Sequence, residues 1–242
     1  MVLAPATPAD CFNMAYEACR IALKYMIPVI LLSDGYIANG SEPWKIPDID
    51  SLPEIETRLT KKKEGFAPFQ HDNPNLSRPW ALPGTPGMEH RVGGLEKWEE
   101  TGHVSYDPEN HQKMVELRQQ KVDVIANDIA LAKAFGKGNG DLLVIGWGGT
   151  HGALRSAVET AQEKGMSVSH LHLRYLNPLP RNLGEILVKF QKVMIAELNL
   201  GQLAAIIRAK FLVDAIGLNK IQGKPFTQTE VFNKITELVK GA

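Results

Sequence analysis

Residues 142–158, LLVIGWGGTHGALRSAV, place four glycines between an apolar run and an amphipathic segment. Such a turn can hold a phosphate, because backbone N–H groups at a helix N-terminus attract anions. The spacing Gly146-x-Gly148-x-x-x-Gly152 is not the dinucleotide-binding spacing, and no Lys-Ser/Thr follows as in a P-loop. We therefore expect a tight strand-to-helix turn packed against a neighbour. An anion bound near Thr150 is the alternative.

Histidines and carboxylates form the other candidates for chemistry. His170 and His172 alternate within VSHLHLRYL and share one strand face. No carboxylate or cysteine with metal-ligand spacing accompanies them, so we predict core or interface histidines and no metal site. Asp34 and Glu197 each follow an apolar run, where ligands of parallel α/β sheets bind. Such residues also cap the next helix, and both interpretations stay open.

The elements that would position these residues begin near the N-terminus. A helix is predicted from Thr7, with Pro8 in its first position and Asp10 completing a T-x-x-D capping box. A buried strand is predicted at residues 29–33. One helix and one strand are the end of an α/β domain rather than a whole one. We therefore expect that an earlier part precedes this sequence in a longer chain or as a separate subunit.

The next segment, residues 46–106, is rich in proline and glycine and carries scattered aromatic residues. We predict a long arm packed over a surface, because aromatic side chains do not stay solvated along a disordered linker. A long helix is predicted from Asp107, with Pro108 at its first position, through Phe135, where glycines end it.

The remainder of the chain alternates strands and helices, which predicts right-handed crossovers and a parallel sheet. The predicted strands are 141–147, 166–176 and 192–198, and the predicted helices are 150–164, 181–189, 201–216 and 227–240. Judged from the residues alone, the chain is an α/β protein.

Composition excludes several classes of function. Basic and acidic residues number 27 each, which argues against a nucleic-acid binder that relies on positive charge. Cys11 and Cys19 lie eight positions apart in one predicted helix, about 12 Å, too far for a disulfide. Two cysteines alone hold neither a structural zinc nor an iron–sulfur cluster. Reduced thiols, no leader pattern and no apolar run of about 20 residues predict a cytoplasmic protein without a membrane span.

Several long motifs resemble one family in its own order. They are APATPADCFNMAYEACRIALKYMIPVILLSDGYIANGSEPW, PWALPGTPGMEHRVGGLE, TGHVSYDPENHQKMVELRQQKV, LHLRYLNPLPRNLGEIL and AELNLGQLAAIIRAKFL. They closely resemble the alpha subunit of 2-oxoacid:ferredoxin oxidoreductases, most like the 2-oxoglutarate or 2-oxoisovalerate enzymes of bacteria. The resemblance covers the C-terminal part of a typical alpha subunit. The family's YPITPSS-type motif and the beta subunit's G-D-G motif are absent from this sequence.

The resemblance implies a domain organisation. Residues 1–45 would end the pyrimidine-binding thiamine-type domain, residues 46–106 would form an extended arm, and residues 107–242 would form a transketolase C-terminal-like α/β domain. The fold class it implies is α/β, with a parallel-sheet domain preceded by a partial α/β segment and the long arm.

The resemblance also implies an activity. The complete enzyme would decarboxylate a 2-oxoacid oxidatively to an acyl-CoA and pass electrons to ferredoxin. It would use thiamine diphosphate, Mg²⁺, an iron–sulfur cluster and CoA, none of them bound by this chain alone. The implied partners are a beta subunit, ferredoxin through the complex, and further copies of this chain. No nucleic acid or membrane partner is implied, and the chain alone would be inactive.

The resemblance implies site residues without naming a catalytic one. Asp34 and Asn39 would orient a loop near the cofactor or the partner. Thr85 and Arg91 would meet a substrate carboxylate or a phosphate, and a CoA phosphate would lie near Thr150. An arginine forks onto a carboxylate in two parallel hydrogen bonds.

Two alternatives stay open. Arg91 could instead form a structural ion pair with Glu89 or Glu96. The whole chain could be a stand-alone transketolase-C-like module that binds acyl-CoA or a nucleotide, with a Rossmann-type dehydrogenase domain as a third interpretation.

Overall fold

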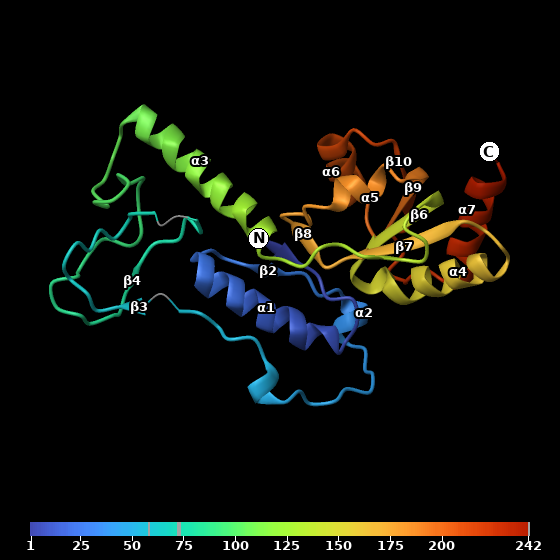
Figure 1. Ribbon diagram of the computed structural model, residues 1–242, viewed down its shortest axis with the longest axis horizontal. Helices are drawn as coiled ribbons and strands as arrows, with labels where there is room; N and C mark the ends of the chain where they lie inside the picture. The colour runs from blue at the N-terminus through green and yellow to red at the C-terminus, as the bar shows by residue number, and fades with distance from the viewer. Residues whose placement is uncertain (58, 72–73, 242) are drawn as a thin grey trace. The chain divides into compact units, whose positions relative to one another are not determined.

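The computed structural model describes residues 1–57, 59–71 and 74–241 (Figure 1). These residues form two compact units. The arm unit consists of Met1, Tyr16–Val29 and Ile46–Asp128, and the sheet unit consists of Val2–Ala15, Ile30–Lys45 and the chain from Ile129 onward. Helix α1 (Asp10–Tyr25) contributes residues to both units. The domain boundaries at residues 45 and 106 stay a prediction, because these units follow contacts rather than chain order.

The sheet unit contains a five-stranded sheet of order β10-β9-β6-β7-β5. Strands β6, β7, β9 and β10 are parallel, and the short β5 runs antiparallel to β7. The parallel α/β architecture is therefore confirmed. The strands are β5 (Ala134–Phe135), β6 (Gly140–Trp147), β7 (Val168–Leu173), β9 (Phe190–Glu197) and β10 (Ala215–Asn219).

Helices cover both faces of this sheet, and each face has its own core. Alternate residues of a strand point to opposite faces. Leu143 and Ile145 of β6 therefore pack with α5 (Leu183–Leu187) and α6 (Gln202–Phe211). Their neighbours on the other face pack with α4 (His151–Glu163) and α7 (Gln228–Lys240), drawn yellow and red in Figure 1. A strand buried on both faces explains the unbroken apolar run that the sequence shows here.

A second, small sheet in the same unit corrects two predictions. It has the order β2-β1-β8, with β2 (Ile30–Leu31), β1 (Val2–Leu3) and β8 (Tyr175–Asn177). The predicted buried strand at 29–33 is wrong, since β2 is a short edge strand and Ile30 is 57% exposed. The predicted single strand at 166–176 is two strands. Ala4 N donates to Arg174 O at 2.9 Å, so the chain leaves β7 there and pairs with β1.

Two helices end earlier than the sequence predicts. Asp107 caps α3 (Pro108–Val124) by accepting from Asn110 N at 2.8 Å, as predicted, but the helix does not continue to Phe135. It tightens into η2 (Ile125–Asn127), and Phe135 pairs with His170 in the sheet. The predicted helix 201–216 is also too long, since α6 ends at Phe211 and β10 begins at Ala215.

Helix α1 begins at Asp10, later than predicted. The Thr7 hydroxyl oxygen accepts from Asp10 N at 3.2 Å, so Thr7 caps the helix. The Asp10 carboxylate accepts from Ala6 N at 3.0 Å and pairs with Arg174. It therefore ties the helix N-terminus to the β7–β8 connection. Cys11 and Cys19 lie on this helix as free thiols.

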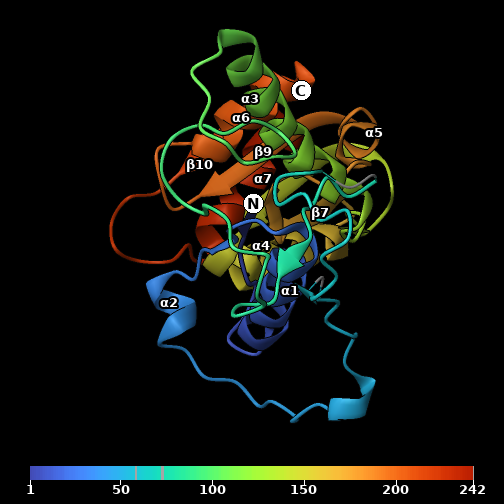
Figure 2. The same ribbon diagram turned by 90° about the vertical axis from the view of Figure 1, so that its left-hand side faces the viewer.

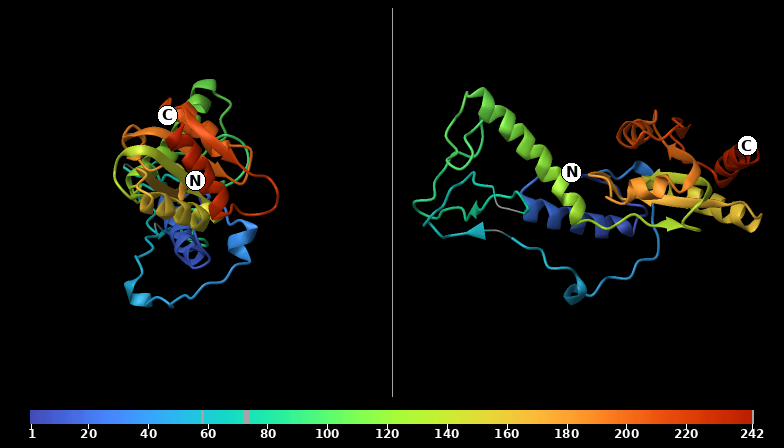
Figure 3. Two further views of the ribbon diagram at one scale, coloured as in Figure 1. Left: turned by 90° about the vertical axis from the view of Figure 1, so that its right-hand side faces the viewer. Right: turned by 45° about the horizontal axis from the view of Figure 1, so that its top comes forward.

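The arm unit is mostly irregular chain, as predicted for residues 46–106. Figure 2 shows extended chain around the single turn η1 (Ile49–Ser51), and the right-hand view of Figure 3 shows α3 as one helix preceded by turns. Strands β3 (Leu59–Thr60) and β4 (Trp80–Ala81) pair over two residues. Phe69 is 8% exposed, and its ring lies under the Arg78 guanidinium at 4.2 Å. Phe69 therefore anchors this segment, whereas Trp98 is 43% and Tyr106 is 84% exposed, so the predicted packing of the aromatic residues holds only in part.

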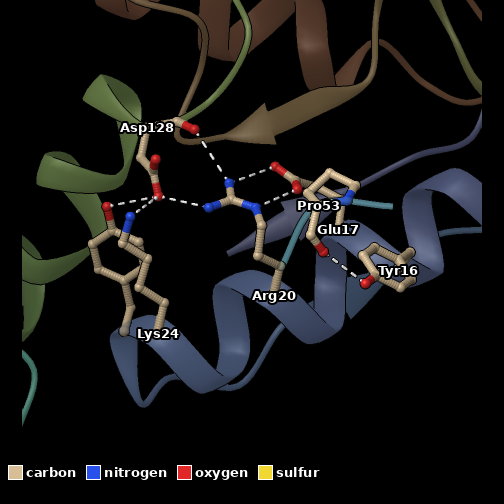
Figure 4. A network of polar contacts seen from close by, with 7 residues as sticks. Tyr16, Glu17, Arg20, Lys24, Pro53 and Asp128 are labelled. Carbon is tan, nitrogen blue, oxygen red and sulfur yellow. Dashed lines mark hydrogen bonds and ion pairs between the residues drawn. The ribbon is translucent and has the colours of Figure 1, made fainter. Parts of the chain in front are cut away.

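A polar network around Asp128 closes the end of α3 onto α1 within the arm unit (Figure 4). The Asp128 carboxylate accepts from Arg20 Nη1 at 2.9 Å and from the Tyr25 hydroxyl at 3.1 Å, and Lys24 Nζ lies 3.1 Å away. Arg20 also binds Glu17 at 2.7 Å, and this contact raises the pKa of the guanidinium. Burial raises the pKa of Asp128, but the hydrogen bonds from Arg20 and Lys24 outweigh it and lower the pKa. Tyr16 donates to Pro53 O at 2.7 Å beside it.

Within the described ranges, no helix is both long enough and apolar enough to cross a bilayer.

Candidate functional site

The carboxyl ends of β6, β9 and β10 meet at one edge of the sheet, where parallel α/β proteins bind ligands. A pocket of about 440 Å³ opens at this edge. Its lining residues come from the start of α2 (Gly35–Ala38), the end of β9 and the segment after β10. They are Asp34, Gly35, Tyr36, Leu198, Lys220, Ile221, Gly223, Lys224 and Pro225.

The glycine turn at this edge is closed by a carboxylate of the chain itself. The turn η3 (Gly148–Thr150) leads into α4, and Gly149 N donates to Asp34 Oδ2 at 2.5 Å. The other Asp34 oxygen accepts from Ile37 N at 2.9 Å and caps α2. A Cβ on Gly149 would lie 2.5 Å from Asp34 Oδ2, so glycine is needed for this approach. Asp34 therefore occupies the position at the turn that an external anion would take.

Thr150 is part of the same turn and is 2% exposed. Its hydroxyl donates to Trp147 O at 2.8 Å. A Cβ on Gly146 would lie 2.5 Å from Thr150 Oγ1, which explains the glycine that precedes the turn. Thr150 thus packs the turn, and its assignment to a phosphate stays a prediction.

Glu197 is the second carboxylate at the edge and is fully buried. Its two oxygens accept from Leu203 N and Ala204 N, both at 2.9 Å, in the first turn of α6. Asn199 Nδ2 and Trp147 Nε1 also donate to the Glu197 carboxylate, at 3.0 Å and 3.3 Å. The sequence left two interpretations open for these strand-end carboxylates, ligand binding or helix capping. In the structure both Asp34 and Glu197 cap helices.

Lysines provide the positive charge near this pocket. Lys220 Nζ donates to Pro225 O at 2.9 Å and pairs with Glu230 at 2.8 Å. The Lys220 hydrogen bond, with those from Thr227, lowers the pKa of Glu230 to about 2. Lys224 is exposed and has no ion pair within the described part of the chain. Lys224 is therefore the cation at this edge that remains available to a ligand or a partner.

The remaining predicted residues lie on exposed or irregular chain. Asn39 ends α2 and donates to Gly35 O at 2.8 Å. Thr85, in the arm unit, donates to Leu82 O at 2.8 Å and lines a pocket of about 320 Å³. Arg91, in the same unit, is exposed and makes no ion pair with any residue that the structure describes.

The ion-pair alternative for Arg91 is not formed. The Glu89 carboxylate accepts from Gly87 N at 2.8 Å, and Glu96 binds Arg118 and His111. Among the described residues, the Arg91 guanidinium has no carboxylate partner. Its predicted contact with a substrate carboxylate or a phosphate stays a prediction.

The two histidines of β7 do share a face, and a third histidine joins them. The ring of His151, the first residue of α4, is tilted against His170 with centroids 5.7 Å apart and meets His172 edge-on with centroids 4.8 Å apart. Burial lowers the pKa of His170 to about 3 and that of His172 well below its usual value. The sequence could have indicated this third histidine, because His151 begins the helix that follows β6 and packs over β7. Among the described residues, no group of three His, Cys, Asp or Glu side chains is arranged to hold a metal ion.

The edge does not fit a diphosphate with its metal. Three amides at this edge already bind carboxylates of the chain itself: Gly149 N binds Asp34, and Leu203 N and Ala204 N bind Glu197. The described residues also lack a cluster of carboxylates that would hold Mg²⁺. We therefore derive no step through thiamine diphosphate on this chain's residues.

Fold and edge together define an α/β protein whose sheet-edge helices are closed by internal carboxylates. Residues 1–109 match the family described as "Pyruvate flavodoxin/ferredoxin oxidoreductase, thiamine diP-bdg". Residues 140–231 match "Pyruvate:ferredoxin oxidoreductase core domain II". The chain belongs to the 2-oxoacid:ferredoxin oxidoreductase family, in the part that corresponds to the alpha subunit.

Three relatives illustrate this similarity. The chain is 50% identical, over 99% of its length, to 37% of the 2-oxoglutarate oxidoreductase subunit KorA of Mycobacterium tuberculosis. It is 29% identical, over 99% of its length, to 38% of the alpha subunit of 2-oxoacid:ferredoxin oxidoreductase 1 of Aeropyrum pernix. A solved 2-oxoglutarate:ferredoxin oxidoreductase from Magnetococcus marinus, with 2-oxoglutarate, coenzyme A and succinyl-CoA bound, matches 98% of this chain and 42% of its own. That match has a TM-score of 0.90 at 30% identity. The chain thus spans well under half of the length of these relatives.

Proposed function

We propose that this chain is part of a thiamine-diphosphate-dependent 2-oxoacid:ferredoxin oxidoreductase. The complex converts a 2-oxoacid to an acyl-CoA and passes electrons to ferredoxin. The observation that carries the proposal is the similarity to alpha subunits over 99% of the chain, together with the family match at residues 1–109. Thiamine diphosphate, Mg²⁺, an iron–sulfur cluster and CoA belong to the complete complex in this proposal.

This chain supplies scaffold, subunit contacts and part of a substrate path. Asp34 has a positioning role in this proposal. It holds α2 against the glycine turn and so fixes the position of Asn39. Arg91 and Thr85 act on a carboxylate or phosphate, a role supported by the free guanidinium of Arg91. Thr150 contributes through the turn that it packs.

The partners we propose are a beta subunit, ferredoxin through the complex, and a second copy of this chain. Self-association is supported by exposed apolar side chains on the sheet unit, such as Leu200 at 81% and Leu212 at 90%. Two free cysteines support a cytoplasmic location.

Reconstitution tests the proposal. The chain is mixed with a beta subunit and the remaining portion of a KorA-type alpha subunit, with thiamine diphosphate, Mg²⁺ and CoA. We expect reduction of methyl viologen that depends on a 2-oxoacid, and none from the chain alone. 2-Oxoglutarate, 2-oxoisovalerate and pyruvate are compared to rank substrates. Turnover by the chain alone would contradict an incomplete site, and failure to associate with the other subunits would contradict the whole proposal.

Arg91→Gln belongs in the same assay. If Arg91 meets the substrate carboxylate, KM rises about tenfold or more, because a charged hydrogen-bonded pair is lost. Arg181→Gln, at another exposed arginine, is the matched control. Equal KM values in the two variants would remove Arg91 from the substrate path.

The alternative functions predict different ligands for the chain alone. Calorimetry with CoA, NAD and thiamine diphosphate separates them. Tight CoA binding favours a stand-alone acyl-CoA module, and tight NAD binding favours a dehydrogenase domain. The carboxylates that already bind Gly149 N in η3 and Leu203 N and Ala204 N in α6 support the scaffold role, in which none of the three binds tightly.

A further inference from the structure

A pocket lies within the arm unit, and neither Arg91 nor Thr85 lines it. It has a volume of about 620 Å³, within the roughly 300–1,000 Å³ of small-molecule sites. Its apolar walls come from residues 26–28, which follow α1, from Phe69 and from Met114 and Val122 of α3. The described cationic residues of its lining are Arg78, Lys97, Arg118 and Lys121, against one carboxylate, Glu96.

Two of these cations already have partners. Arg118 binds Glu96 at 3.2 Å, so their charges offset each other. Lys97 is 6% exposed and donates to Leu95 O at 2.9 Å, with its ammonium 5.5 Å from the Phe69 ring centroid. These two residues therefore close one side of the pocket.

The other two cations have no counter-charge among the described residues. Lys121 is 8% exposed and makes no ion pair or hydrogen bond with any described residue. Arg78 lies over Phe69 at 4.2 Å and makes one long contact, 3.4 Å, to Pro68 O. No carboxylate in the described ranges lies within ion-pair distance of either. His71 adds no charge at neutral pH, because burial and the nearby Lys121 lower its pKa.

Buried charges without a partner are unfavourable, and buried charges in proteins are normally paired. Titratable groups with shifted pKa values in a cleft therefore mark a candidate binding site. Burial lowers the pKa of Lys121 to about 8, with Arg78 contributing, so the ammonium remains the main form at pH 7. Burial lowers the pKa of Arg78 as well. A planar guanidinium and a compact ammonium together suit an oxyanion, the first by a two-pronged contact and the second as a point charge.

We propose that this pocket binds a small organic dianion, held by Arg78 and Lys121 and packed against Phe69 and Met114. The shared chemistry is two negative charges on phosphate or carboxylate groups. The proposal rests on the arm unit alone and does not depend on the oxidoreductase activity.

The test uses the full chain and two probes, inorganic phosphate and 2-oxoglutarate, in thermal melts and calorimetry. Sodium chloride at equal ionic strength and the monoanion acetate are the control solutes. We expect one dianion to raise the Tm more than either control solute and to bind with one site per chain. A response to phosphate identifies a phosphate ligand, and a response to 2-oxoglutarate identifies a dicarboxylate. If neither dianion raises the Tm more than sodium chloride and acetate do, the proposal is overturned.

Lys121→Met and Lys113→Met form the matched pair of variants. Both residues lie on α3, but Lys113 is 60% exposed and pairs with Glu99. Lys121→Met keeps the apolar stem and removes the charge, so the Tm of the free chain should rise by a few degrees. Its dianion affinity should fall by more than about tenfold. Lys113→Met should bind as the wild type does. Equal affinity in both variants would overturn the proposal, whatever the Tm values are.

Discussion

At the scale of residues, the sheet edge shows how a phosphate-like turn can serve the chain itself. Asp34 and Glu197 each accept backbone N–H groups at the start of a helix or turn. A carboxylate there satisfies amides that have no intrahelical partner and faces the positive end of the helix dipole. The glycine pattern indicated a tight turn, and that part was predictable. The partner of the turn was not, because Asp34 lies 115 positions earlier in the chain.

Gly149→Ala tests this close approach. The added Cβ would lie 2.5 Å from Asp34 Oδ2, so the carboxylate must shift and lose its hydrogen bond. We expect unfolding free energy to fall by about 1–3 kcal/mol in urea titrations. Gly152→Ala is the control, because no atom lies within 4 Å of its added Cβ and alanine favours the helix. Matching losses in the two variants would contradict the role given to Asp34.

The three clustered histidines predict acid sensitivity. His170 has a folded pKa of about 3, against 6.5 when unfolded, so the unfolded chain binds the extra proton as the pH falls below 6.5. Stability from this residue is therefore full above about pH 6.5 and is lost toward pH 3. From pH 7 to pH 5 the loss is about 2 kcal/mol.

His170→Leu should flatten this pH dependence by that amount, measured as unfolding free energy in urea at pH 7 and pH 5. The unfolding free energy of His170→Leu at pH 7 also depends on how leucine packs in this site, so the test compares the change between the two pH values. His103→Leu, at an exposed position, tests whether loss of any histidine has the same effect. An unchanged slope in His170→Leu would show that His170 is not held neutral.

At the scale of elements, periodicity located strands and helices but not their ends. The helix predicted to reach Phe135 ends at Val124, because η2 tightens the chain and Asp128 then binds Arg20 and Lys24 of α1. The strand predicted at 166–176 divides because its second half pairs with β1. In both cases a distant segment competes with the local pattern, and a pattern contains no information on that partner.

Asp128→Ala tests the network that ends α3. It removes the carboxylate that Arg20, Lys24 and Tyr25 share and leaves the partly buried guanidinium with Glu17 and the backbone carbonyl of residue 128. We expect a loss of about 2–4 kcal/mol in unfolding free energy, from urea titrations followed by circular dichroism. Asp123→Ala, which breaks an exposed bond to Gln119, should change stability by less than about 0.5 kcal/mol. A loss for Asp128→Ala as small as that of the control would show that the network does not hold the helices.

At the scale of the whole molecule, the chain spans 37% of the KorA subunit and 42% of the solved oxidoreductase chain that it matches. At its sheet edge, Gly149 N, Leu203 N and Ala204 N bind carboxylates of the chain itself. Activity that appears only on assembly is the result that the proposed function predicts for reconstitution. Arg91 and Lys224 are the positions where we expect contacts with another subunit, because their charges have no partner among the described residues.

The sequence by itself determined the α/β class, the parallel sheet, the irregular aromatic arm, the caps at Asp107 and Thr7, and the family. Each of these follows from local pattern or from motif order, which are written along the chain. The tertiary structure alone decided that Asp34 closes the glycine turn and that His151 joins His170 and His172. It also decided that Arg78 and Lys121 face one pocket with no counter-charge among the described residues. The physical reason is the same in each case. Hydrogen bonds, stacking and burial depend on distance in space, and residues far apart in sequence meet only when the chain has folded.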